Sequence, residues 1–302
     1  MDSPPPAPPP PPPPPPPHLP TEQYRNWLDL PQEVTESILK RLSVIEILTS
    51  AQKVCLLWRN ICRGPSMWRT LYMGYVQDTW DMKAYDLKDM CRHAVDLSCG
   101  QLVGIKVGSF CTDNLLKYIT GSSSELRYLG LLRCWKISDK GFSEAAANIP
   151  LLEELELSYC SWTHNFLEAF GRSCPHLKSL KLRSAVYNLG DDPFKGCDLS
   201  ALAIAENMPG LVGLLLVGNK LTNDGLQAIL DGCPDLQSLE LWRCRHVSLE
   251  GDFGRKCSER IKNLQFHYFS DQEFEKILED SGYYDYDYDN DYENFGLEYI
   301  DD

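Results

Sequence analysis

The sequence has 302 residues, of which 43% are hydrophobic, so the chain can form one large domain or two smaller ones with a substantial core. Its formal net charge is −14, and residues 283–302 alone hold eight acidic and no basic side chains; without a basic stripe to neutralise phosphates, a nucleic-acid-binding protein is disfavoured. Twelve cysteines without a secretory signal pattern favour reduced thiols in the nucleus or cytoplasm, and no stretch approaches the ~20 apolar residues of a membrane span.

Residues 1–22 are dominated by proline, with an unbroken run from Pro8 to Pro17. Such a run is typical of polyproline II, which rises ~3.1 Å per residue and has no internal hydrogen bonds. We expect a stiff, disordered tail; a docking site for an aromatic-lined groove is the alternative interpretation.

Residues 23–73 have a helical pattern. Pro31 precedes apolar residues at helical spacing, Ser43 and Glu46 match a capping box that begins a second helix, and Gly64-Pro65 ends a third helical stretch. A unit this small is marginal alone, since a single core below ~70–80 residues rarely supplies enough stability. Its apolar surface therefore either binds a partner or caps the domain that follows, and periodicity does not decide between the two.

Several residues of this unit resemble the F-box motif in order and spacing: Leu30-Pro31, Ile38-Leu39, Leu42, Val54-Cys55, Trp58-Arg59 and Trp68. The sequence departs from the motif where apolar Val44-Ile45, followed by Glu46, replaces an acidic residue that is often found there. The resemblance implies a three-helix unit that binds the adaptor subunit of SCF cullin–RING ubiquitin ligases. Carried over to this chain, the residues that build or support the adaptor-binding surface are Leu30, Pro31, Ile38, Leu39, Leu42, Val54, Cys55 and Trp58.

After a linker or cap at 74–101, residues 102–270 form about seven repeats. The frame Leu-x-x-Leu-x-Leu occurs five times, with degenerate copies at both ends, and the repeats start at Leu102, Leu126, Leu152, Leu177, Leu211, Leu236 and Ile261. Proline stands two residues before the first leucine in four copies, at Pro150, Pro175, Pro209 and Pro234. One repeat is longer and has an insertion around 191–200. This pattern resembles the cysteine-containing leucine-rich repeat.

The second and third leucines of each frame are two apart on a short strand, so both point inward, and a stretch such as Gly225–Leu230 covers them as a helix. Each unit buries its apolar face only against its neighbours. We therefore expect an α/β fold in which a three-helix F-box precedes an open horseshoe arc of leucine-rich repeats, with disordered termini.

Five cysteines recur at two repeat positions: Cys134, Cys160 and Cys244 at one, Cys174 and Cys233 at the other. This recurrence predicts buried packing cysteines, because a buried thiol behaves as a small apolar group. Metal binding is the competing interpretation, and it is disfavoured because the chain has no Cys-x-x-Cys pair.

Strand residues that alternate with the inward leucines are expected on the concave face, where they could bind a protein substrate, since aromatic and arginine side chains are frequent in interface hot spots. Exposed Leu215 and Val217 would give this face an apolar centre; an ordinary solvated surface is the alternative. Substituting Trp242 and Arg243 together is expected to weaken substrate capture and leave adaptor binding intact. The predicted substrate-binding residues are Tyr128, Arg133, Trp135, Glu154, Glu156, Tyr159, Lys181, Arg183, Leu215, Val217, Trp242, Arg243 and His267, with Leu132, Glu240 and Tyr268 on the same face.

Residues 271–282 are assigned to a C-terminal cap and residues 283–302 to a disordered acidic tail with six tyrosines. A calcium loop in the tail is disfavoured because Tyr292 stands where a glycine turn is needed. No phosphate loop, nucleophile elbow or zinc-protease motif occurs, and the six histidines lack ligand spacing. We expect a non-catalytic protein without cofactor or metal.

Together the two motifs resemble the plant branch of the F-box/leucine-rich-repeat family, over residues 27 to about 269. This resemblance implies a substrate receptor that binds the SCF adaptor subunit, and through it the cullin and RING subunits, and holds an unknown protein for ubiquitination. We expect neither nucleic acid nor membrane as a partner. Two alternatives stay open: a repeat scaffold outside any ligase, and a small-molecule co-receptor, for which Lys181 and Arg183 alone are too few basic groups.

Overall fold

The structure, a computed structural model, describes residues 29–74, 84–160, 162–184 and 197–267. The predicted proline-rich tail (1–22), C-terminal cap (271–282) and acidic tail (283–302) lie outside the described residues, as do Tyr268 and most of the predicted insertion around 191–200.

The N-terminal helical unit, residues 29–68, contains three short α-helices: α1 (Gln32–Leu39), α2 (Val44–Thr49) and α3 (Leu56–Cys62), with 3-10 turns at Ala51–Lys53 and Pro65–Trp68. Helix α2 begins at the predicted capping box: the Glu46 N–H donates to Ser43 Oγ at 3.2 Å, and the Ser43 N–H donates to Glu46 Oε2 at 2.8 Å. These two bonds satisfy donors that the first turn of a helix leaves open. The buried Trp68 indole N–H donates to the Cys62 carbonyl at 2.7 Å and fixes the end of the unit.

The remainder of the described chain builds one parallel sheet of eight strands in sequence order. The strands are β1 (Thr70–Met73), β2 (Gly104–Val107), β3 (Tyr128–Leu132), β4 (Glu154–Ser158), β5 (Ser179–Arg183), β6 (Gly213–Val217), β7 (Ser238–Trp242) and β8 (Asn263–His267). Each is in register with the next, so that the middle leucines Leu129, Leu155, Leu180, Leu214 and Leu239 lie side by side along the sheet.

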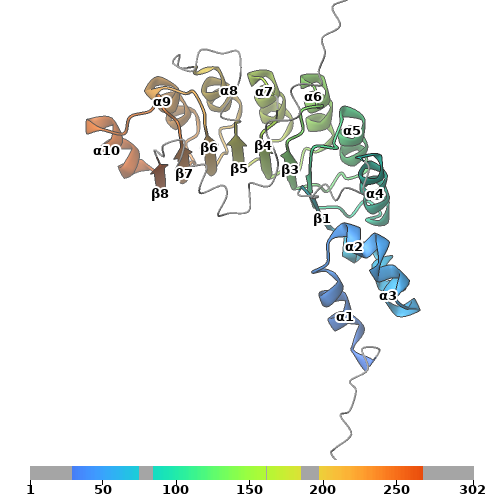
Figure 1. Ribbon diagram of the computed structural model, residues 1–302. Coiled ribbons are helices and arrows are strands. Elements are labelled where there is room, and N and C mark those ends of the chain that lie inside the picture. The colour runs from blue at the N-terminus through green and yellow to red at the C-terminus, as the bar shows by residue number, and fades with distance from the viewer. Residues whose placement is uncertain (1–28, 75–83, 161, 185–196, 268–302) are drawn as a thin grey trace, which may run out of the picture.

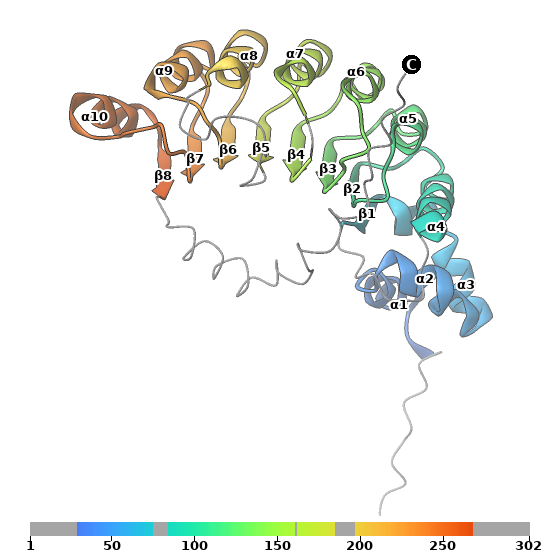
Figure 2. The same ribbon diagram turned by 45° about the horizontal axis from the view of Figure 1, so that its top comes forward.

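Helices cover one side of this sheet: α4 (Ala84–Leu97), α5 (Asp113–Gly121), α6 (Asp139–Asn148), α7 (His164–Ser173), α8 (Leu199–Asn207), α9 (Asn223–Gly232) and α10 (Gly251–Arg260). Figures 1 and 2 show the strands on the inner side of a curved stack, the helices on the outer side, and α1–α3 at its N-terminal end. The predicted helical unit followed by an open repeat arc is thus confirmed. In the described part of the chain, no helix combines the length and apolar character that crossing a membrane requires.

The core lies between the sheet and the helices. The inward leucines of the frames are almost fully buried; Leu129, Leu131, Leu155 and Leu157 are each 0% exposed. Aromatic rings from helices α6 and α7 pack together in the core of the central repeats. The centroids of the Phe142 and Phe166 rings are 5.4 Å apart, and Phe170 packs edge-on against Phe166 at 6.0 Å. Each repeat is therefore held by its neighbours, as expected for a stack with a continuous core.

Strand β1 is not marked by the leucine frame in the sequence, and it lies inside the segment 23–73 that is predicted to form the helical unit. Its register with β2 shows that Trp68, Leu71 and Met73 occupy the three positions of the leucine frame, and all three are at most 2% exposed. An aromatic residue and a methionine at two of the three positions concealed the pattern. Since β1 follows η3 (Pro65–Trp68) directly, the helical unit and the arc share one core.

The recurring cysteines behave largely as predicted. Cys134, Cys174, Cys233 and Cys244 are buried, with at most 2% of each exposed. Cys160 differs, because it is only half-buried.

Candidate interaction surfaces

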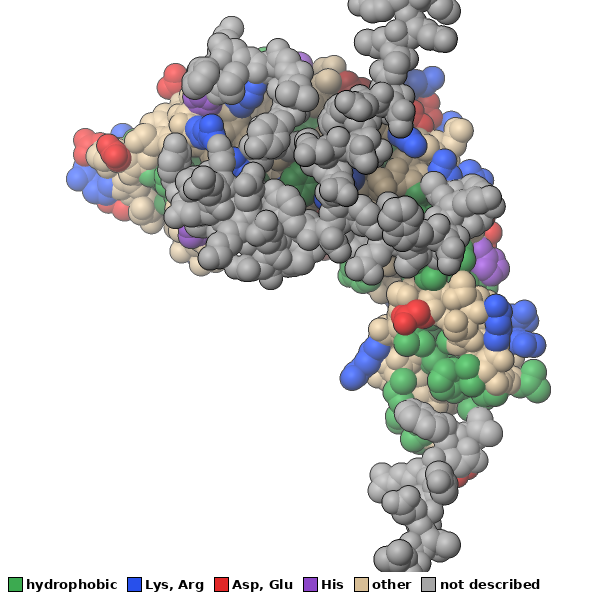
Figure 3. All heavy atoms as spheres, viewed as in Figure 1, with side chains coloured by type: hydrophobic (Ala, Val, Ile, Leu, Met, Phe, Trp, Pro, Cys, Tyr) green, Lys and Arg blue, Asp and Glu red, His purple; other side chains and the backbone are tan. Residues whose placement is uncertain are grey.

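The N-terminal helical unit exposes large apolar side chains. Val54 and Leu56, on either side of the α3 N-cap residue Cys55, are 62% and 72% exposed, and Val34 on α1 is 43% exposed. Figure 3 shows apolar side chains gathered on the lower part of this unit. A contiguous exposed apolar patch on a folded domain marks an interaction site.

The residues predicted for adaptor binding divide by exposure. Pro31 and Val54 are exposed, and five others are half-buried at the surface: Leu30, Ile38, Leu42, Cys55 and Trp58. Leu39 is 0% exposed, so it supports the unit from inside. Leu56, which at 72% is more exposed than Val54, was missed because apolar spacing alone does not separate an outward position from an inward one.

The charge of this part of the chain is opposite to that of the whole. Residues 29–74 contain six basic and four acidic side chains, a net charge of +2, whereas the whole chain has −14. One of the basic groups, Lys40, pairs with Glu36 at 2.7 Å, and the pKa of Glu36 is lowered chiefly by the hydrogen bond from Lys40.

On the inner face of the sheet, the residues between each pair of inward leucines form a row across the strands: Tyr72, Lys106, Gly130, Glu156, Lys181, Leu215, Glu240 and Gln265. The row begins with an exposed aromatic ring, since Tyr72 is 64% exposed. Its centre is charged and its C-terminal part is mixed.

Glu156 is the centre of a polar cluster on this face. Its carboxylate, in a residue only 7% exposed, accepts hydrogen bonds from Lys106 Nζ at 3.1 Å, from the Tyr128 hydroxyl at 2.9 Å and from the Arg183 guanidinium. Lys181 and Glu154 form a second, more exposed ion pair beside it. The structure thus brings together Tyr128, Glu154, Glu156, Lys181 and Arg183, all predicted for this face, and adds Lys106.

Burial is the largest single influence on the Glu156 carboxyl and raises its pKa. The charges of Lys106 and Arg183, together with the hydrogen bonds from Lys106 and Tyr128, outweigh burial, and the pKa lies below its ordinary value of 4.5. Burial, followed by the negative charge of Glu156, raises the pKa of the Tyr128 phenol. Tyr128 therefore stays protonated and acts as a donor to an ionised carboxylate.

Gly130 leaves the space that this hydrogen bond needs. A Cβ atom at Gly130 would lie 2.6 Å from the Tyr128 hydroxyl oxygen and 2.9 Å from Lys106 Cγ, both closer than van der Waals contact allows. The phenol ring crosses the face at this glycine to reach Glu156 on the next strand. The sequence signal was available in principle, because Gly130 interrupts a strand of leucines.

Further along the arc, Leu215 and Val217 form a small apolar cluster with Trp242. The expectation that the two are exposed was wrong: they are 8% and 5% exposed. Val217 is in register with Trp242, whose ring packs against the cluster and meets the His267 ring edge-on at 5.0 Å. Among the described residues, these side chains form an apolar patch on the sheet rather than a solvated surface.

Four predicted residues lie at the rim of the sheet, beyond the strands. Arg133, Tyr159 and Arg243 each follow the last residue of a strand and have φ of 53°, 55° and 55°, in the left-handed region. The N–H of Arg133 donates to the Ser158 carbonyl and that of Tyr159 to the Arg183 carbonyl, both at 2.8 Å. Strand alternation therefore ends before these residues, and the expectation that they continue the concave strand positions was wrong. Trp135, the fourth, is 47% exposed.

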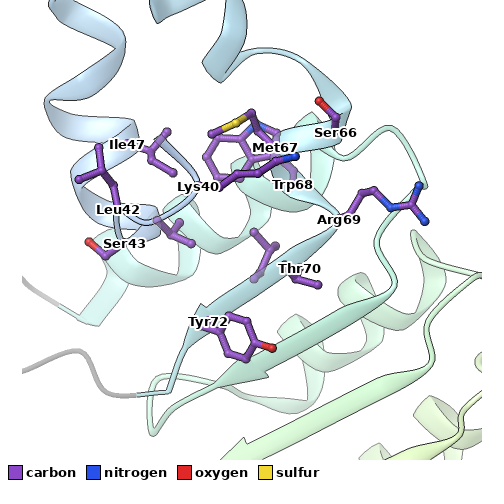
Figure 4. Close-up of a pocket in the computed structure, with 12 residues that line it drawn as sticks. Lys40, Leu42, Ser43, Ile47, Ser66, Met67, Trp68, Arg69, Thr70 and Tyr72 are labelled. Carbon is purple, nitrogen blue, oxygen red and sulfur yellow. The ribbon is translucent and has the colours of Figure 1, made fainter. Parts of the chain in front are cut away.

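A pocket of about 300 Å³ lies where the helical unit meets β1. Figure 4 shows Met67 and Trp68 beside Ile47 and Leu42, with Thr70 and Tyr72 on the adjoining strand. Its basic groups are Lys40, which is paired with Glu36, and Arg69. In the described ranges, no three His, Cys, Asp or Glu side chains gather as a metal site would require.

Comparison with known proteins places these surfaces in a family context. The F-box-like family matches residues 27–74. The F-box protein SKIP19 of Arabidopsis thaliana is 50% identical over 237 residues, which cover 78% of this chain and 76% of that protein. A provisionally named F-box/LRR-repeat protein of the same plant, number 21, is 47% identical over 260 residues, 81% of this chain and 82% of that protein.

Another provisionally named F-box/LRR-repeat protein of Arabidopsis thaliana, number 23, is 49% identical over 244 residues, but the match spans only 54% of that relative. Among solved structures, the chain is similar to one in the crystal structure of the Rad7 and Elc1 complex in yeast, with 16% identity and a TM-score of 0.40 over 61% of this chain and 60% of that chain. A likeness at this level does not bear on function.

Proposed function

Because the chain belongs to the F-box/leucine-rich-repeat family, we propose that it is the substrate-recognition subunit of an SCF-type ubiquitin ligase. The N-terminal helical unit binds the ligase adaptor subunit, which connects it to the cullin and RING subunits. The inner face and rim of the arc capture the protein to be ubiquitinated. The chain itself performs no bond chemistry.

The observation that carries this proposal is the apolar surface of the helical unit, which lies inside the residues matched to the F-box-like family. Val54 and Leu56 are mostly exposed although both are large and apolar. Burying one such side chain fully contributes ~1.5–3 kcal/mol, so a few anchors of this kind support a stable interface.

Charge supports the same assignment. The net charge of +2 on residues 29–74 favours an adaptor with an acidic surface, because complementary charges raise the rate of encounter and select the partner. The rest of the chain is acidic and would repel such a partner. The helical unit is therefore the part of the chain to which an acidic adaptor would be steered.

Substrate capture is assigned to two exposed aromatic side chains, Tyr72 on the inner face and Trp135 at the rim of the sheet, rather than to the polar cluster. Glu156 has its oxygens occupied by Lys106, Tyr128 and Arg183, so a substrate that displaced these donors would leave buried charge unpaired. Tyr72 and Trp135 are instead accessible, at 64% and 47% exposure, and aromatic anchors are typical of interface hot spots.

The receptor would act by raising local concentration. A substrate bound to the arc and a ubiquitin-charged enzyme bound elsewhere in the ligase become parts of one complex, so that attack by a substrate lysine is effectively intramolecular. Catalysis then depends on two separate surfaces of this chain, one for the ligase and one for the substrate.

The test uses the full-length chain and purified SCF adaptor subunit in a binding assay. Leu56→Asp places a charge in the proposed interface and is expected to weaken adaptor binding at least about tenfold, while the circular dichroism spectrum and melting temperature stay unchanged because Leu56 is a surface residue. Leu199→Asp is the matched control, since Leu199 on α8 is also apolar and exposed, at 53%, but lies on the arc. Full binding by the Leu56→Asp variant would contradict the proposal.

Capture of substrate is tested in cells under proteasome inhibition. Affinity purification of the wild type should yield ligase subunits and a substrate, whereas the Leu56→Asp variant should keep the substrate and lose the ligase subunits. Loss of both together from a folded variant would show that the helical unit and the arc do not act separately.

A further inference from the structure

Three cysteines lie in the turns that follow strands β2, β3 and β4. Cys134 and Cys160 occupy the same position of consecutive repeats, two residues after the end of β3 and of β4. The residues just before them, Arg133 and Tyr159, have nearly equal φ of 53° and 55°. The two turns therefore leave their strands with similar backbone conformations. Cys111 lies in the preceding turn, where its thiol donates to the Thr112 carbonyl at 3.9 Å.

The two cysteines are directly hydrogen-bonded. The backbone N–H of Cys134 donates to Cys160 Sγ at 3.4 Å, while the Cys134 thiol itself donates to the Gly108 carbonyl at 3.2 Å. In-register neighbours on adjacent strands are ~4.8 Å apart, and disulfides join residues whose Cα atoms are ~4.4–6.8 Å apart. A disulfide between the two positions therefore fits the repeat spacing without moving a strand.

Cys134 and Cys160 differ in solvent exposure. Cys160 is half-buried, whereas Cys134 and Cys111 are fully buried. Hydrogen bonding with Cys134 lowers the pKa of the Cys160 thiol, although burial acts in the opposite direction. Burial alone raises the pKa of Cys174 to about 12. A partly exposed cysteine whose sulfur accepts a hydrogen bond is typical of reactive cysteines.

We propose that Cys160 and Cys134 form a reversible disulfide when the protein meets a hydroperoxide. The Cys160 sulfur attacks the terminal peroxide oxygen, the O–O bond breaks, and the product is a sulfenic acid and hydroxide, which takes up the thiol proton as water. The Cys134 sulfur then attacks the Cys160 sulfur and loses its proton, and the sulfenic hydroxyl leaves as a second water. The two thiols lose two electrons together, and one hydrogen peroxide is reduced to two waters.

The bond would connect the turns that carry Arg133 and Tyr159 at the rim of the sheet. Cys134 would exchange its hydrogen bond to the Gly108 carbonyl, at 3.2 Å, for the covalent link. A thiol reductant restores both cysteines, as is usual for disulfides that sense oxidation in reducing compartments.

The experiment treats the full-length, reduced chain with hydrogen peroxide, blocks the remaining thiols, and maps tryptic peptides by mass. Cleavage after lysine and arginine places Cys111, Cys134 and Cys160 in separate fragments, 107–117, 134–136 and 141–172. The expected product is a linked pair of fragments 134–136 and 141–172, a mass about 2 Da lower, two fewer blocked cysteines, and full recovery after a dithiol reductant.

Variants give the control. Cys160→Ala should abolish the linked pair, and Cys244→Ala, at the same repeat position beside Asn219, should leave it unchanged. A link between Cys111 and Cys134, irreversible oxidation of Cys160, or no reaction at peroxide levels that oxidise exposed Cys99 and Cys197 would each overturn the proposal. Because the decisive measurement is made on the wild type, a variant that fails to fold does not affect the result.

Discussion

The Tyr128 hydroxyl donates a hydrogen bond to the Glu156 carboxylate at 2.9 Å, from strand β3 to strand β4. The same carboxylate holds Lys106 from β2 and Arg183 from β5, so one side chain connects four consecutive strands on the inner face of the arc. This cluster fixes the shape of the face before any partner binds.

Glu156→Gln should lower the free energy of unfolding by about 3 kcal/mol, because it removes the negative charge that compensates two largely buried cations. Urea denaturation measures the change. Glu154→Gln is the matched control: the Glu154 and Lys181 side chains are 33% and 37% exposed, and a pair this accessible contributes less than about 1 kcal/mol. Equal effects of the two substitutions would show that burial of the cluster is not what makes it stabilising.

The same carboxylate predicts a pH dependence. Its pKa in the folded chain lies below the ordinary value of 4.5, so its contribution to stability is complete above about pH 5 and is lost as the pH falls through the folded pKa. The difference in unfolding free energy between the wild type and Glu156→Gln should therefore be constant near neutral pH and shrink on acidification. A difference that widens in acid would contradict the lowered pKa.

Gly130→Ala should destabilise the chain by about 1–3 kcal/mol, since the added Cβ meets the Tyr128 hydroxyl oxygen and Lys106 Cγ. Gly213→Ala is its counterpart on β6, where a Cβ meets nothing within 4 Å. There the substitution should be neutral or slightly stabilising, because alanine restricts the unfolded chain. Thermal unfolding of the two variants side by side measures the contrast; similar melting temperatures would rule out the close approach of the phenol.

Trp135→Ala should reduce the amount of substrate that co-purifies with the chain by at least about tenfold and leave adaptor binding unchanged, if the rim captures the substrate as proposed. Because Trp135 is 47% exposed, its loss should change stability little. Leu202→Ala on α8, 43% exposed, serves as the control. Undiminished capture by Trp135→Ala would remove the rim from the proposed substrate site.

The double substitution of Trp242 and Arg243 is a less selective test than the sequence suggested. Arg243 is 5% exposed, and Trp242 packs against Leu215 and Val217, so both substitutions disturb packing. Reduced capture by that variant would not separate a lost contact from a loosened repeat.

The repeat fold was predictable because its signal is local and recurs. Each leucine frame specifies a strand with two inward side chains, and the proline before it marks the end of the preceding helix. The capping box at Ser43 was equally local, and it appears as predicted. Strand β1 was missed because Trp68 and Met73 fill leucine positions, which shows that the frame depends on size and apolar character more than on leucine itself.

The surfaces were harder to predict, for two physical reasons. The cluster joins Lys106 to Glu156 across 50 residues of sequence, and only the accumulated register of two strand pairs brings them together. The rim residues were assigned to strands because nothing in the sequence marks the change to left-handed backbone at Arg133 and Tyr159, where asparagine or glycine would have given a clear signal.

The strict register of the eight strands also gives the inner face a fixed spacing. Strands recur every ~4.8 Å, whereas a peptide in the polyproline II conformation advances ~3.1 Å per residue with three residues per turn, so one turn of such a peptide laid across the arc spans about the same length as two strand intervals. Every third side chain of such a guest would face the same row on alternate strands, such as Tyr72, Gly130 and Lys181 on β1, β3 and β5. Recognition of a guest sequence would therefore repeat every three residues. Substituting one residue of the row would change the side-chain preference at a single position of the guest.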